Sequence, residues 1–126
     1  MKFMNRVLFA LFLVLASFAS QAADNCTGPA EGSKDYIKAT KLIESLPEFN
    51  KWNKSHRLPI AFGEPMDSKM LNEGICYWSV SVYADQGSRL ELWNIFLVPV
   101  FGQKILVQDP IEGDYVSLNQ WRKKRP

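Results

Sequence analysis

The spacing of the apolar residues changes from a helical to a strand period near residue 58. Between Ser33 and Leu46, apolar side chains recur every three or four residues and lysines occupy the other side, as in an amphipathic helix with one buried face. Ser33 is a good N-cap, and Pro47 can end this helix and begin a second short turn over residues 48–54. Beyond residue 58 the apolar residues alternate, which is typical of strands. This change of period predicts an α+β fold.

The second half of the chain is predicted to form an antiparallel meander. Two long segments rich in β-branched and aromatic residues flank the turn-forming sequence Asp85-Gln86-Gly87-Ser88, which predicts a hairpin. Pro59 favours an edge position for the first strand, and residues 63–74 are expected to be a loop with a helical turn at Ser68–Leu71. Ser117 can cap a last short helix. The predicted strands are Leu58–Phe62, Ile75–Ala84, Arg89–Val98 and Lys104–Gln108. The expected architecture is therefore an N-terminal helix packed on a curled antiparallel sheet of about four strands.

The predicted hairpin has an apolar face and a mixed face. Alternation places Trp78, Val80 and Val82 on one side of the first strand, and Trp93, Ile95 and Leu97 on one side of the second. The mixed face holds Tyr77, Ser79, Ser81, Tyr83, Leu90, Leu92, Asn94 and Phe96. Two interpretations of the mixed face are open. The C-terminal segment, with Leu118 and Trp121, folds back over it, or it is an open aromatic surface that binds something.

Residues 1–22 have the layout of a secretory signal peptide. Lys2 and Arg6 precede an apolar run, and Ser20-Gln21-Ala22 has the small-x-small pattern of a cleavage site. The apolar run is too short to cross about 30 Å of hydrocarbon with margin. We therefore expect a single periplasmic or secreted domain at residues 23–126, with no transmembrane span in the mature chain.

Cleavage would also change the charge. Loss of two of the 15 basic residues leaves 13, equal to the 13 acidic ones, so the mature chain has no general attraction for nucleic acid. Residues 122–125 form a basic C-terminal tail, which is either a solvated, frayed end or a contact for an acidic partner. Cys26 and Cys76 are expected to form a disulfide in an oxidising compartment.

The sequence offers little for catalysis, and we expect no enzyme, no cofactor and no metal site. His56 is the single histidine, lies in a polar stretch, and is expected to be a solvated imidazole. A zinc site would need both cysteines and would forfeit the disulfide. Glu112-Gly113-Asp114 lacks the alternating carboxylates of a calcium loop. Phosphate-binding and nucleophile-elbow motifs are also absent from the sequence.

The order of one helix followed by four strands over residues 33–109 resembles the cystatin-like architecture and, more loosely, the small PepSY-type modules of bacterial envelopes. The local resemblance lies in Leu46-Pro47-Glu48-Phe49, which ends the helix, and in residues 98–107, where Gly102 turns one strand into the next. The Gln-Val-Val-Ala-Gly-type loop of cystatin inhibitors is not present. The resemblance implies that the chain is an exported inhibitor, immunity protein or accessory binding domain.

Two binding roles remain open. The first is an inhibitor or immunity protein that binds an envelope-targeting hydrolase or toxin through exposed charged and aromatic side chains. Its candidate contact residues are Glu64, Asp67, Glu73, Tyr77, Tyr83, Asp85 and Arg89. The second is a small-ligand or peptide-binding module with a pocket between helix and sheet, lined by Tyr36, Trp52, Trp78 and Trp93, although these four can equally be core residues. A homodimer through the edge strand near Leu58 is a further option.

Overall fold

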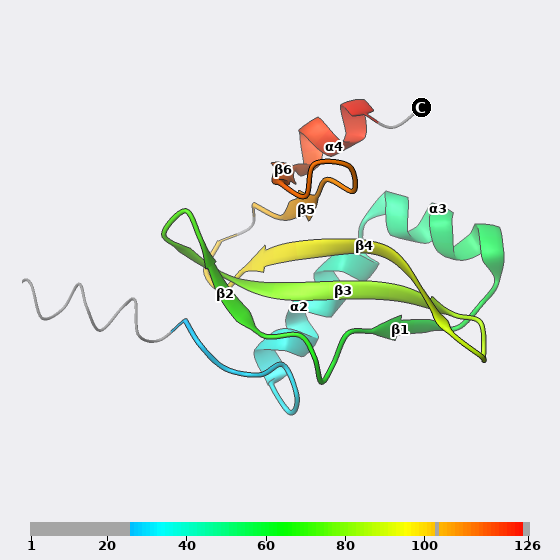
Figure 1. The fold of residues 1–126 in the computed structure, drawn as a ribbon, viewed down its shortest axis with the longest axis horizontal. Coiled ribbons are helices and arrows are strands. Elements are labelled where there is room, and N and C mark those ends of the chain that lie inside the picture. Colours follow the sequence, from blue (N-terminus) through cyan, green and yellow to red (C-terminus); the bar gives the residue numbers. More distant parts are fainter. Residues whose placement is uncertain (1–25, 103, 125–126) are drawn as a thin grey trace, which may run out of the picture.

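The computed structural model describes residues 26–102 and 104–124. Within these ranges the chain has three helices and a six-stranded antiparallel sheet (Figure 1). The α+β class expected from the change of period is therefore confirmed. The proposed signal peptide and the last residue of the basic tail, Arg125, lie outside the described residues. No helix in the described ranges is long and apolar enough to span a membrane.

Helix α2 (Lys34–Glu44) forms where the helical spacing predicts it. The Oγ of Ser33 accepts a hydrogen bond of 3.2 Å from the backbone N–H of Tyr36, which caps the first turn. Asp35 lies in that turn, where its negative charge interacts favourably with the positive end of the helix dipole. One face of α2 packs on the sheet. The buried residues of α2 are Tyr36, Ala39, Thr40 and Ile43.

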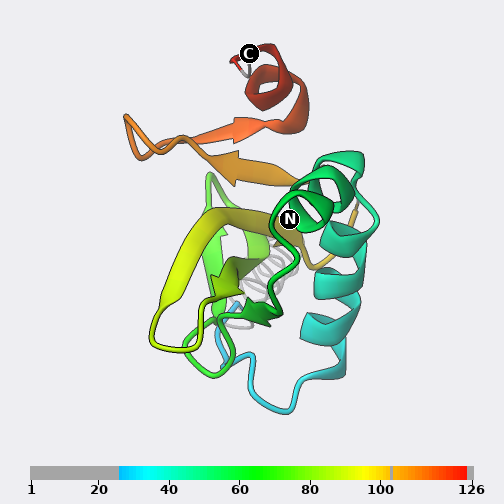
Figure 2. The ribbon, with the colours of Figure 1, turned by 90° about the vertical axis from the view of Figure 1, so that its right-hand side faces the viewer.

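Helix α3 (Pro47–His56) begins at Pro47, where the helical spacing of apolar residues in α2 was predicted to end. Proline suits the first turn of a helix because the N–H that it lacks would have no partner there. The helix runs two residues beyond the predicted range and ends at Arg57, whose φ is 55°. Both α2 and α3 lie on the same side of the sheet (Figure 2), and Phe49 of α3 is buried in the shared core.

The sheet has the strand order β1-β3-β4-β5-β6, and β2 pairs with the same strand, β3, as β1 does. Every pairing is antiparallel, and the β3–β4 hairpin is the longest. The strands are β1 (Ile60–Phe62), β2 (Lys69–Asn72), β3 (Ile75–Asp85), β4 (Leu90–Pro99), β5 (Leu106–Gln108) and β6 (Tyr115–Ser117). The predicted meander is therefore present, with two more strands than expected.

Two segments differ from the prediction. The helical turn expected at Ser68–Leu71 is wrong, because β2 occupies this segment and forms a hairpin with β3. Glu73 and Gly74 turn this hairpin with φ values of 50° and 79°, so the turn needs a left-handed backbone at both positions. Strand β6 was not expected, because three residues are too few to display an alternating pattern.

The core lies between the sheet and the helices. Phe96 is fully buried there, opposite Val80 in the β3–β4 pair, so its assignment to the mixed face is wrong. The cause is an irregularity in β4: Asn94 pairs with Val82 and Leu92 with Tyr83. The extra residue between them reverses the alternation. The core-facing residues of the two long strands are Trp78, Val80, Val82, Phe96 and Val98.

Helix α4 (Leu118–Lys124) extends this same core. The cap expected at Ser117 is present, since its Oγ accepts a 3.2 Å hydrogen bond from the N–H of Gln120. Trp121 is buried and packs edge-on against Phe96, with ring centroids 5.8 Å apart. The C-terminal segment therefore packs on the helix side of the sheet, and the expectation that it covers the mixed face is wrong.

Two ion pairs hold α4 in place. Arg122 pairs with Glu48 of α3, and the Nζ of Lys124 lies 2.7 Å from the Oδ2 of Asp109, in the loop between β5 and β6. As far as Lys124 the tail is therefore helical and not frayed, although its side chains are exposed to solvent. The side chains of Arg122 and Lys124 remain exposed to solvent. We therefore expect these ion pairs to position the helix but to contribute little to stability.

Acid is expected to loosen this helix. The hydrogen bonds from Lys124 and from the N–H of Ile111 hold the pKa of Asp109 below its ordinary value of 3.8. The folded state then binds fewer protons than the unfolded chain, so this stabilisation is present above about pH 4 and is lost as the pH falls through the folded pKa. Near-ultraviolet circular dichroism of the tryptophans should show a loss of signal in the wild type as the pH falls below about 4. This pH-dependent loss should be smaller in Asp109→Asn and unchanged in Asp114→Asn. An unchanged transition in Asp109→Asn would contradict this assignment.

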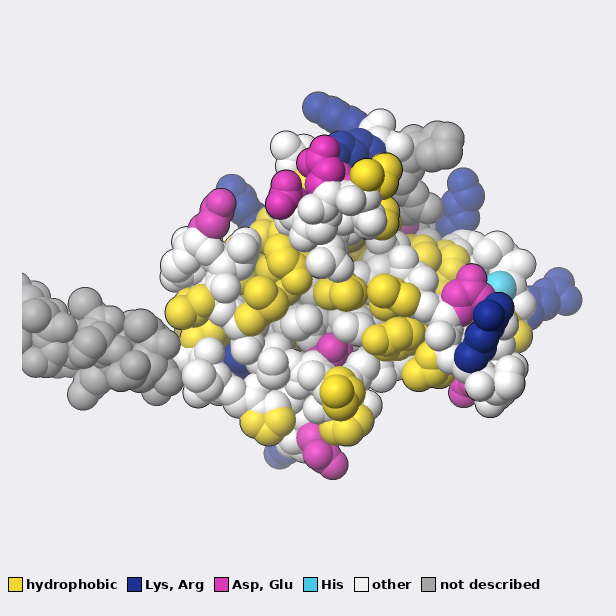
Figure 3. Space-filling model, in the orientation of Figure 1, with side chains coloured by type: hydrophobic (Ala, Val, Ile, Leu, Met, Phe, Trp, Pro, Cys, Tyr) yellow, Lys and Arg dark blue, Asp and Glu magenta, His cyan; other side chains and the backbone are white. Residues whose placement is uncertain are grey.

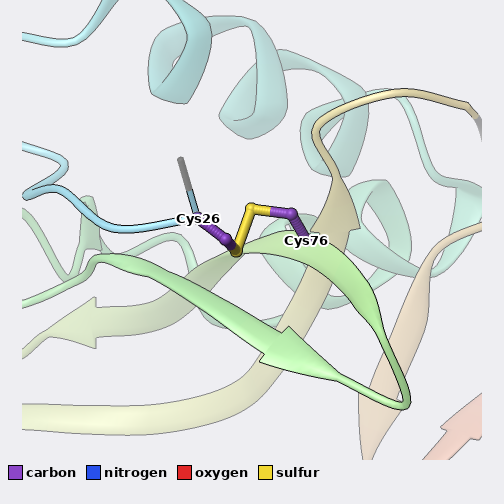
Figure 4. The surroundings of a disulfide bond; sticks show 2 residues. All are labelled: Cys26 and Cys76. Atoms are coloured by element: carbon purple, nitrogen blue, oxygen red, sulfur yellow. A yellow bond between two sulfur atoms is a disulfide. The ribbon is translucent and has the colours of Figure 1, made fainter. Parts of the chain in front are cut away.

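The predicted disulfide between Cys26 and Cys76 is present (Figure 4), with a Cα–Cα distance of 5.5 Å and a sequence separation of 50. It joins the segment before α2 to the start of β3. Backbone hydrogen bonds reinforce the connection, from Ala30 to Asp67 at 2.9 Å and from Lys69 to Gly28 at 3.0 Å. The start of the described chain is thus fixed to the sheet.

Candidate functional site

One face of the sheet carries no helix of the described chain. Figure 2 shows α2 and α3 on the opposite side, and Figure 3 looks onto this free face, where hydrophobic side chains run across the sheet. Burial differs along its length. Tyr77 and Leu97 are 5% and 0% exposed, whereas Leu92 and Leu90 are 49% and 52% exposed. The accessible apolar surface of this face therefore includes the end of the β3–β4 hairpin.

The irregularity in β4 turns the two leucines outward. Leu92 pairs with Tyr83 and Leu90 with Asp85, on the face away from the helices. Trp93 has no opposite residue in this register, and its ring packs toward the core against Phe96, with centroids 5.6 Å apart. Neighbouring positions of one strand thus supply both a buried aromatic ring and an exposed apolar pair.

Polar side chains fix the turn beside these leucines. The Oδ1 of Asp85 accepts a 2.8 Å hydrogen bond from the N–H of Gly87. The Nε of Arg89 donates to the Oε1 of Gln86 at 3.2 Å, and Gln86 also donates to Glu91. The turn is thereby ordered by its own side chains, which lowers the entropy lost when a partner binds. Of the predicted contact residues, Tyr83, Asp85 and Arg89 come together here.

The remaining predicted contact residues lie elsewhere. Glu73 is exposed at the β2–β3 turn, at the opposite end of β3 from Asp85. Glu64 is exposed in the loop after β1 and accepts a 3.1 Å hydrogen bond from the N–H of Gly32. Tyr77 is buried. The fold therefore does not bring the predicted acidic contact residues together in one exposed cluster.

Asp67 is the clearest correction, because it is 6% exposed and not a surface residue. Its Oδ2 accepts from the hydroxyl of Tyr36 at 2.5 Å and from the N–H of Ser81 at 3.0 Å, and its Oδ1 accepts from the Ser81 hydroxyl at 2.9 Å. Burial, together with the bond to Asp67, raises the pKa of Tyr36 well above its ordinary value of 10.0. The phenol therefore stays protonated and donates, so this cluster is built for structure.

The four residues of the alternative ligand site do not share one pocket. Trp52 and Trp93 stack with centroids 4.5 Å apart and an interplanar angle of 6°, and they line a cavity of about 230 Å³. Trp78 lines a different cavity of about 310 Å³, between α2 and the end of β4. Tyr36 is 1% exposed and packs edge-on against Trp78. The prediction of one helix–sheet pocket lined by all four residues is therefore wrong.

His56 is not the solvated imidazole that was expected. Its Nδ1 accepts a 2.9 Å hydrogen bond from the N–H of Leu58, its ring packs edge-on against Trp52, and its Nε2 is buried. An accepting Nδ1 places the proton of the neutral ring on Nε2. Across the described residues, no group of three or more His, Cys, Asp and Glu side chains is placed to hold a metal ion.

No family model, no curated protein and no solved structure matches the chain. These comparisons therefore do not bear on the resemblance to cystatin-like and PepSY-type domains. Candidate functional residues therefore have to be identified from the geometry of this chain. The end of the β3–β4 hairpin combines exposed apolar side chains, an ordered turn and charged side chains.

Proposed function

We propose that the protein binds another protein through the end of the β3–β4 hairpin. The contact surface consists of Tyr83, Asp85, Arg89, Leu90 and Leu92, which we call the hairpin-end surface. One observation carries the proposal: Leu90 and Leu92 are half exposed side by side on a sheet face that no described helix covers. Adjacent exposed apolar side chains flanked by charges are typical of recognition surfaces.

We further propose that this binding serves an exported inhibitor or immunity protein, whose partner is an envelope-targeting hydrolase or toxin. The signal-like sequence of residues 1–22 and the disulfide between Cys26 and Cys76 support an oxidising compartment outside the cytoplasm. A cystatin-like sheet that is covered by helices on one face and cross-linked by the disulfide would hold the hairpin rigidly. A rigid contact surface loses less entropy on binding, which favours a tight complex. This role requires no catalytic residue in the chain itself.

Removal of the two leucines tests the hairpin-end surface. The oxidised chain from residue 23 is used to capture its partner from envelope and secreted fractions of the source cells, and the captured protein is then purified for calorimetric titration. Leu90→Ser with Leu92→Ser should weaken the complex about 100-fold, because each buried leucine contributes about 1.5 kcal/mol to binding. The melting temperature should hardly change, because both side chains are half exposed.

A second double variant is the matched control. Ile37 on α2 and Leu71 on β2 are 47% and 48% exposed, close to the values of the hairpin leucines. Ile37→Ser with Leu71→Ser removes a similar apolar area away from the hairpin end and should leave the affinity within about threefold, a range of roughly 0.7 kcal/mol. Equal losses in both variants, or a loss in the control alone, would refute the hairpin-end surface as the binding site.

A further inference from the structure

A cavity opens directly beside the hairpin-end surface. It has a volume of about 230 Å³ and lies between the end of α3 and the strands of the hairpin. Leu92 belongs both to this cavity and to the hairpin-end surface. A partner that covers the leucines and extends around the part of β4 that does not pair with β5 can therefore place one of its side chains in the cavity. The volume fits a single long side chain but not a large ligand.

The lining of the cavity favours a positive charge. Glu91 is the one charged side chain among the described residues that line it. Ser55 and His56 belong to the last turn of α3, where the free carbonyl groups carry the negative end of the helix dipole. The indoles of Trp52 and Trp93, stacked on each other, complete the wall, and indole rings attract cations more strongly than other aromatic rings do.

The partners that the lining residues already have leave room for such a ligand. Glu91 accepts a hydrogen bond from Gln86, but a carboxylate offers about four lone-pair sites and can accept from a guanidinium as well. Ser55 donates its hydroxyl hydrogen to the carbonyl of Trp52 at 2.6 Å, so its oxygen can still accept. Carboxylate, hydroxyl and indole are thus complementary to a planar group with several N–H donors.

We infer that the cavity receives an arginine side chain of the protein partner, with its guanidinium paired to Glu91 and lying against the Trp52–Trp93 stack. Arginine fits better than lysine because its planar group can stack on an indole and bind a carboxylate through two N–H groups at once. The inference rests on the proposed protein-binding function and adds the chemistry that the partner must present beside its apolar contact.

The cavity can be tested without the partner. N-acetyl-arginine-N′-methylamide is titrated into the ¹⁵N-labelled oxidised protein at constant ionic strength, and the four indole N–H resonances are followed. Saturable shifts are expected for Trp52 and Trp93, and much smaller ones for Trp78 and Trp121, which do not line this cavity. The citrulline analogue has nearly the same shape without the charge, and it should bind at least tenfold more weakly.

Glu91→Gln should weaken arginine-amide binding at least tenfold, whereas Glu73→Gln, an exposed carboxylate at the other end of β3, should leave it unchanged. Equal binding of the arginine and citrulline amides, equal binding by both variants, or no saturable shift would each overturn the inference. These outcomes are separate from the proposed function, because loss of affinity in the Leu90 and Leu92 double variant is measured on the partner. Partner binding that survives Glu91→Gln at full strength would also overturn the arginine site while leaving the hairpin-end surface intact.

Discussion

Asp67→Ala is expected to lower the free energy of unfolding by about 3–5 kcal/mol, one of the two largest effects that we predict. The substitution removes the acceptor of three buried donors: the Tyr36 hydroxyl, the Ser81 hydroxyl and the Ser81 N–H. Each buried donor left without an acceptor costs about 1–3 kcal/mol, and water that enters the vacated space recovers part of the total. Urea unfolding monitored by tryptophan fluorescence measures the loss.

Asp67→Asn provides the matched comparison. An asparagine oxygen at the position of Oδ2 can still accept from Tyr36 and from the Ser81 N–H, while its amide group donates to the Ser81 hydroxyl. We therefore expect a loss of about 1 kcal/mol, well below that of the alanine variant. Tyr36→Phe removes one donor together with its bond and should fall between the two. Equal stability of wild type and Asp67→Ala would show that the carboxylate is not the element that holds this part of the sheet.

Removal of the disulfide, by Cys26→Ser with Cys76→Ser, should cost roughly 4 kcal/mol. The estimate follows from the 50-residue separation, because the cross-link restricts the unfolded chain by an entropy that grows with the logarithm of loop length. The folded state should change little, since the backbone bonds of Gly28 and Ala30 to the β2 region do not depend on the sulfurs. Urea unfolding of the double variant gives the value.

Chemical reduction supplies the control for this experiment. Wild-type protein unfolded in the presence of a thiol reductant should match the double variant, and the reductant should not affect the variant itself. A loss under 1 kcal/mol in both cases would mean that the chain between the two cysteines is already compact when unfolded, so that the cross-link removes little entropy. A loss in the variant without a loss on reduction would point to the serine side chains instead.

The helices and the two long strands could be predicted because each spans enough residues for a period to emerge. The apolar positions of α2, its cap at Ser33 and the start of α3 at Pro47 all depend on neighbours within one turn. The β3–β4 hairpin likewise follows from two alternating segments around the turn that Asp85 organises. Local signals of this kind survive folding when the tertiary contacts agree with them.

The features that were missed depend on contacts outside their own segments. Strand β2 exists because β3 offers an edge at Trp78, and no pattern within Lys69–Asn72 marks it as a strand. The irregularity at Trp93 reverses the alternation of β4 in response to the core, and so misled the assignment of Phe96. Asp67 lies in a polar loop where surface exposure is the ordinary outcome, and only the fold brings Tyr36 and Ser81 to it.

The candidate site was foreseen only in part. The turn residues Asp85 and Arg89 were expected at the hairpin tip, and the mixed face was expected to hold Leu90 and Leu92. The cavity was foreseen only through Trp52 and Trp93, two of the four residues of the predicted helix–sheet pocket, because its walls join the end of α3 to β4 over about 40 residues of chain. The signal that could have pointed to it is the helical spacing of Trp52 and His56, which places an aromatic ring and an imidazole on one side of α3.

The position of Asp67 also determines how this sheet can meet other sheets. Between β1 and β2 the chain leaves the edge of β3, which would normally expose backbone groups able to pair with a foreign strand. Here the Asp67 carboxylate takes the N–H of Ser81, and the N–H of Gly63 donates to the Ser81 carbonyl at 2.9 Å. The middle of this edge therefore offers no template for strand addition, and β1 itself is three residues long and follows Pro59. A second copy would therefore find little backbone to join near Leu58.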